Sequence, residues 1–69
     1  MNNTDKLSEI DGRQVINTGD ICEALGFKLT GKFIEEKLHV KPAARGDVSV
    51  LWFEDELPLI TNNLIKYLA

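Results

Sequence analysis

Two short segments near the middle of the chain carry apolar residues at helical spacing, and they constrain the fold more than any other feature. In "NTGDICEALGF", Ile21 and Leu25 lie one helical turn apart, and in "LTGKFIEEKLHV" Ile34 and Leu38 do the same. Only "GFKLT" separates the two segments. Two short helices joined by such a turn are typical of the helix-turn-helix motif, so the chain is predicted to contain one.

The ends of these helices carry their own signals. Thr18 and Thr30 are the predicted N-caps, because a threonine hydroxyl can accept a hydrogen bond from a free backbone N–H at a helix start. Gly26 suits the left-handed position that follows a helix. We expect the first helix to cover about residues 19–25 and the second to begin after Thr30.

The periodicity changes after the second helix. Pro42 stops any helix, and "VKPAA" and "VSVLWF" read as two strands around "RGD", which places Arg45 at the tip of a β-hairpin. The second strand alternates between two faces, with Val48, Val50 and Trp52 on one and Ser49, Leu51 and Phe53 on the other. Both faces are apolar near its end, so that end is expected to be buried on both sides.

The last segment, "EDELPLITNNLIKYLA", is predicted to be a helix with Asp55 as its N-cap and Pro58 in its first turn. Leu59 is the apolar residue on its polar face. The residues expected on its buried face are Leu57, Ile60, Leu64, Tyr67 and Leu68.

Before the first helix, Asp11 and Gly12 favour a turn between two short extended pieces. We expect residues 1–14 to form a flexible N-terminus with a possible short strand, and residues 15–69 to form a single domain. The order of helices and hairpin predicts the α+β class.

Size and composition exclude several classes of protein. Sixty-nine residues with 43% hydrophobic and 28% charged side chains suit one small globular domain of marginal stability. No apolar run approaches the roughly 20 residues of a membrane span, and the first residues lack the pattern of a secretory signal. A single cysteine permits no intrachain disulfide. We therefore expect a cytoplasmic protein without a metal or cofactor.

Catalytic patterns are also missing. The single His, Cys and Tyr have no motif spacing, and glycines occur singly, so no phosphate-binding loop is expected. Cys22 is interpreted as a small apolar core residue, and His39 as a structural or solvent-facing residue. The acidic run "EDE" is interpreted as a helix cap. We expect neither an enzyme nor a small-molecule substrate.

The charge distribution is uneven. The net charge is −3, yet the segment from Gly26 to Gly46 holds five basic and two acidic residues, and the remainder three basic and nine acidic. The segment thus carries +3 and the remainder −6. A dipolar protein can bind a polyanion in one orientation. Chance clustering on a solvated surface is the alternative.

A helix-turn-helix places its second helix in the major groove of DNA, with the helix N-terminus toward base edges and phosphates. Gly31 would let backbone amides of the second helix approach a phosphate. Lys37 lies near the C-terminus of that helix, where its charge could favour the negative end of the helix dipole instead of contacting DNA. The candidate nucleic-acid-binding residues are Lys28, Thr30, Gly31, Lys32, Lys37, Lys41 and Arg45.

The pieces "TGDICEALGF", "FIEEKLHVKPAARG" and "LWFEDEL" resemble the winged helix-turn-helix domains of MerR-type regulators and phage excisionases, over about residues 18–60. The resemblance implies a small winged-helix domain over residues 15–69 that binds double-stranded DNA, often as dimers or cooperative arrays. It also implies a phage or mobile-element regulator or excisionase-like factor. Carried over, Arg45 lies on the wing, and the recognition helix presents Thr30, Lys32, Glu36 and Lys37.

The chain departs from that family at Glu35 and Glu36, in the middle of the recognition helix, and in a second wing strand without basic residues. An acidic domain of this shape could instead bind a protein partner or a second copy of itself. The candidate residues for such an interface are Leu51, Phe53 and Leu59.

Overall fold

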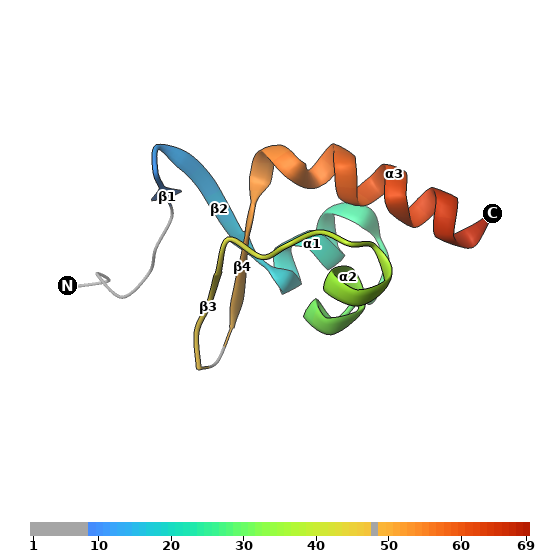
Figure 1. Ribbon diagram of the computed structural model, residues 1–69, viewed down its shortest axis with the longest axis horizontal. Helices are drawn as coiled ribbons and strands as arrows, with labels where there is room; N and C mark the ends of the chain where they lie inside the picture. The colour runs from blue at the N-terminus through green and yellow to red at the C-terminus, as the bar shows by residue number, and fades with distance from the viewer. Residues whose placement is uncertain (1–8, 48) are drawn as a thin grey trace.

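The computed structural model describes residues 9–47 and 49–69, and over these ranges the protein is a small α+β fold. Three helices pack against a four-stranded antiparallel sheet of order β1-β2-β4-β3 (Figure 1). In chain order the elements are β1 (Glu9–Ile10), β2 (Arg13–Asn17), α1 (Thr18–Leu25), α2 (Gly31–Lys37), β3 (Ala44–Arg45), β4 (Val50–Phe53), the 3₁₀ turn η2 (Glu54–Glu56) and α3 (Leu57–Leu68). The expected α+β class is thus confirmed.

The predicted turn at Asp11 and Gly12 is present. Both residues have positive φ angles, 52° and 76°, as the tightest hairpin turns require, and Ile10 pairs with Arg13 across them. Because β2 starts at Arg13, the expected domain boundary between residues 14 and 15 falls inside a strand. Residues 1–8 of the predicted flexible segment lie outside the described residues.

Strand β4 lies at the centre of the sheet. It pairs with β2 on one side, where Val15 faces Phe53, and with β3 on the other, where Arg45 faces Val50. The predicted first hairpin strand over residues 40–44 is wrong in extent, because the N–H of Val40 bonds back to the carbonyl of Ile34 and β3 starts at Ala44. Arg45 consequently belongs to a strand and not to the hairpin tip.

Helix α1 is capped by Asn17, and the prediction that Thr18 caps it is wrong. The Asn17 side chain accepts from the Asp20 N–H at 2.8 Å, and the Asp20 carboxylate accepts from the Asn17 N–H at 3.3 Å. Thr18 is instead the first helical residue, and its hydroxyl accepts from Trp52 Nε1 at 2.8 Å. At the other end Gly26 is left-handed, with φ 77°, as predicted.

Helix α2 begins as predicted, with the Thr30 hydroxyl accepting from the Phe33 N–H at 3.0 Å. The chain leaves α2 by way of His39, which is exposed and has a left-handed backbone with φ 58°. The chain then turns away from the helix and leads through Pro42 to β3.

The prediction that Asp55 caps the last helix is wrong, because residues 54–56 form η2 and α3 starts at Leu57 without a side-chain cap. The expected apolar face is buried at Ile60 and Leu64 only, with Leu57 partly buried. Tyr67 and Leu68 stay 51% and 61% exposed, because the end of α3 extends past the core (Figure 1).

The core lies between the helices and one face of the sheet. Trp52 from β4 is 1% exposed and occupies its centre. Leu51 and Phe53, on the opposite face of the strand, are only half-buried, so burial on both faces is partial. The remaining buried side chains are Val15, Ile21, Ile34, Leu38, Val40, Ile60 and Leu64. In the described part of the chain, no helix combines the length and the apolar character needed to cross a membrane.

Candidate nucleic-acid interface

The start of α2 lies directly against the β3–β4 hairpin. A Cβ added to Gly31 would lie 3.5 Å from the Trp52 ring and 3.7 Å from a Val50 methyl group, which is ordinary van der Waals contact. Gly31 therefore faces the sheet and not the outer surface, where the sequence hypothesis had placed it. This contact fixes where α2 sits relative to the hairpin.

A second contact joins the same two elements at the surface. Arg45 on β3 donates a hydrogen bond through Nη2 to Glu35 Oε1 on α2, and the two form an ion pair. Their side chains are 58% and 35% exposed, so both remain within reach of solvent and of a ligand. The hairpin cation that the sequence assigned to DNA is thus bound to a carboxylate of the proposed recognition helix.

The other residues of α2 divide between two sides of the helix. Lys32 and Glu36 are exposed and lie about 160° from the buried Ile34 on a helix that advances 100° per residue, so they form its outer face. By the same geometry Lys37 lies about 160° from Glu35 and hence away from the hairpin. Lys37 does not share a face with Arg45.

Lys28 lies on the α1 side of the molecule. It lines a shallow hollow together with two carboxylates, Asp20 and Glu23, and with Phe27, which is 50% exposed. Cys22 borders the same hollow. It is half-buried, accepts from the Leu29 N–H and donates to the Leu29 carbonyl, both at 3.2 Å, so the expectation of a simple apolar core residue is wrong.

The seven candidate residues therefore do not lie together on one surface. Thr30 caps α2 and Gly31 packs on Trp52, while Lys28 and Lys37 lie away from the contact between α2 and β3. Lys41 is exposed in the connection to β3 and, among the described residues, has no ion-pair partner. The candidate cations that remain are Lys32 on the outer face of α2, Lys41 on the connection to β3 and Arg45 on β3.

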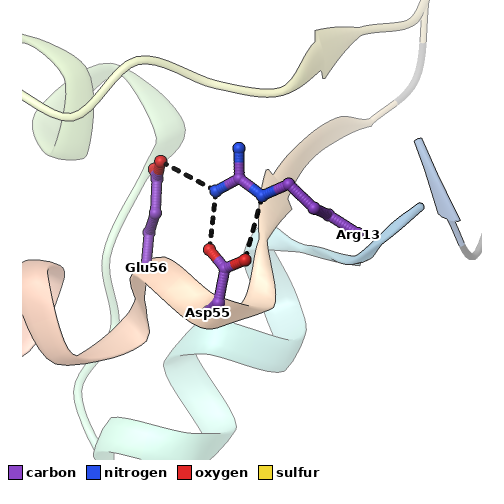
Figure 2. A network of polar contacts seen from close by, with 3 residues as sticks. All are labelled: Arg13, Asp55 and Glu56. Carbon is purple, nitrogen blue, oxygen red and sulfur yellow. Dashed lines mark hydrogen bonds and ion pairs between the residues drawn. The ribbon is translucent and has the colours of Figure 1, made fainter. Parts of the chain in front are cut away.

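The sequence reasoning missed a second arginine cluster on the opposite side of β4. Arg13 on β2 donates from Nε and Nη2 to the two carboxylate oxygens of Asp55, at 2.9 and 2.6 Å, and from Nη2 to Glu56 at 3.3 Å (Figure 2). Its guanidinium also lies 3.7 Å from the centre of the Phe53 ring. The hydrogen bonds from Arg13 hold the pKa of Asp55 below its usual range. This cluster ties β2 to η2.

The candidate protein-interface residues also lie in different parts of the structure. Leu59 is 47% exposed on α3, whereas Phe53 is half-buried and covered by the Arg13 guanidinium. Leu51 is half-buried in the middle of β4, between β2 and β3. Three further large apolar side chains are exposed near the end of α3: Ile65, Tyr67 and Leu68.

No family model, curated protein or solved structure matches this chain. Across residues 9–47 and 49–69, no group of three or more His, Cys, Asp or Glu side chains could hold a metal ion.

Proposed function

We propose that this protein is a small sequence-specific DNA-binding factor of the winged helix-turn-helix type, with α2 as the recognition helix and the β3–β4 hairpin as the wing. The observation that carries the proposal is the contact of α2 with the hairpin, through Gly31 on Trp52 and Glu35 on Arg45. Two adjacent elements of this kind suit DNA, because the major groove admits a helix while a neighbouring hairpin can follow the backbone.

Positive charges lie along α2, the connection and the wing, the elements proposed to contact DNA. Lys32 projects from the outer face of α2, and Lys41 and Arg45 follow on the connection and the wing. Lysine and arginine side chains supply most protein contacts to phosphates, which position a protein on the duplex before bases are read. The remainder of the chain carries −6 against +3 for residues 26–46, and this uneven distribution favours one orientation toward DNA.

The test is a fluorescence-anisotropy titration of duplexes selected from a random library, repeated at several salt concentrations. With three or four phosphate contacts, the slope of log affinity against log salt should be about −2.7 to −3.6. Lys32→Ala should reduce that slope by about 1, whereas Lys66→Ala, on the last turn of α3, should not. Absence of binding to every duplex at low salt would exclude this function.

The second candidate is a protein-interaction or dimerisation module, which the exposed apolar residues of α3 favour. Leu59, Ile65 and Leu68 are 47%, 60% and 61% exposed on one twelve-residue helix. Sedimentation velocity of the wild type and of Leu59→Asp tests it. A dimer that the substitution dissociates, with the fold unchanged, supports this candidate, and a wild type that stays monomeric at high concentration opposes it.

A further inference from the structure

Arg45 is the cation of the wing that would contact DNA, and it already forms an ion pair with Glu35. Arg45 has one carboxylate partner among the described residues, Glu35, and that residue lies on the flank of α2 nearest the wing. Glu35 accepts from Nη2, one of the nitrogens that a guanidinium directs at a phosphate in a two-point contact. A two-point phosphate contact through Nη2 therefore competes with Glu35.

We infer that Glu35 limits the affinity for DNA by holding Arg45 on α2 as an intramolecular competitor of DNA phosphate. The inference rests on the proposed DNA-binding function. Duplexes that fit α2 in the groove bring a phosphate to Arg45 and displace Glu35. Poorly fitting duplexes leave Arg45 on Glu35 and lose one backbone contact.

The exposure of the pair permits such an exchange. Both side chains are more than one-third solvent-accessible, and ion pairs at the surface contribute little net stability, so breaking this one costs less than breaking a buried pair. Glu36 provides a matched control. It is an exposed glutamate on the same helix, and it has no ion-pair partner in the described part of the chain.

The experiment measures how Arg45→Ala changes duplex affinity in three backgrounds: wild type, Glu35→Gln and Glu36→Gln. Arg45→Ala should weaken binding about two- to fivefold more in the Glu35→Gln background than in the other two, because only there is Arg45 released beforehand. Glu35→Gln alone should also raise affinity for the selected duplex at least as much as for a random one, because only the selected duplex has to displace Glu35 in the wild type. An equal effect of Arg45→Ala in all three backgrounds would overturn the inference while leaving DNA binding intact.

A measurement without DNA separates the two kinds of failure. The ¹⁵N heteronuclear NOE of the Arg45 side-chain Nε–H group should fall in Glu35→Gln and stay unchanged in Glu36→Gln, because only the first substitution removes the carboxylate partner of the guanidinium. An unchanged NOE would overturn the inference, because it would mean that Glu35 does not restrain Arg45. If the NOE falls but no variant binds any duplex, the proposed function fails, and the role of Glu35 toward phosphate fails with it.

Discussion

Arg13 and Asp55 lie 42 residues apart in the chain and form a two-point contact across the sheet, with both carboxylate oxygens hydrogen-bonded to one guanidinium. The contact joins the start of β2 to the turn that leads from β4 into α3. The sequence pattern had predicted Asp55 to be a helix cap, and the structure instead places its carboxylate on Arg13.

Substitutions at this contact should lower the thermal unfolding midpoint in a defined order. Arg13→Ala should lower it more than Asp55→Asn, because the alanine also removes the guanidinium from the Phe53 ring and from Glu56. Circular dichroism melts provide the measurement. Glu54→Gln is the control, since Glu54 is an exposed neighbour outside the cluster. A Glu54→Gln midpoint as low as that of Asp55→Asn would show that only net charge matters.

The same contact should make stability depend on pH at the acid end. The pKa of Asp55 lies below its ordinary value of 3.8 in the folded protein, so its stabilising effect is present above that value. The effect disappears as the pH falls through the lower, folded-state pKa. The difference between the urea midpoints of wild type and Arg13→Ala should thus be larger at pH 7 than at strongly acidic pH, where only the loss of the contact with the Phe53 ring remains. A difference that persists unchanged there contradicts this account.

Two glycines should respond in opposite ways to alanine. At Gly31 the new Cβ meets its neighbours at ordinary contact distance, so the higher helix propensity of alanine should stabilise the fold by up to about 1 kcal/mol. At Gly26 the φ of 77° strains any side chain, and alanine should cost about 1–2 kcal/mol. Urea unfolding measures both changes. A destabilised Gly31→Ala would refute the packing described here.

Thr18 should matter through its bond to Trp52 and not as a helix cap. Thr18→Val keeps the shape but leaves the Trp52 N–H, on a ring that is 1% exposed, without its partner. The expected loss is about 1–3 kcal/mol of unfolding free energy, the usual cost of an unsatisfied buried donor. Thr18→Ser retains the hydroxyl and should keep most of the stability. Equal losses in the two variants would point to the methyl group instead.

The features that the sequence predicted correctly are local. Each depends on hydrogen bonds or φ angles within a few residues, so the neighbouring residues in the sequence are enough to predict it. The three features are the Thr30 cap, the left-handed Gly26 and the Asp11–Gly12 turn. The choice of Asn17 over Thr18 as cap was missed because both can cap a helix. The local bonds between Asn17 and Asp20 favour Asn17, and the distant Trp52 engages the Thr18 hydroxyl.

The candidate site was predictable in part for the same reason. The segment around α2 was identified from its lysines, but residues close in sequence face different sides of a helix, which separates Lys37 from Arg45. The partners of both arginines were missed. Glu35 meets Arg45 and Asp55 meets Arg13 only after the sheet has formed, and no local pattern records that.

The central place of β4 has a consequence for the order of folding. Its partner β2 is synthesised first, and Val15 cannot pair with Phe53 until the intervening residues have been added. Contacts between such distant residues form slowly because a long loop has to close, while α1 and α2 lie inside that loop and can form early. Closure of β2 onto β4 is therefore expected to be the rate-limiting step. Substitutions in that strand pair should slow folding more than substitutions in α1.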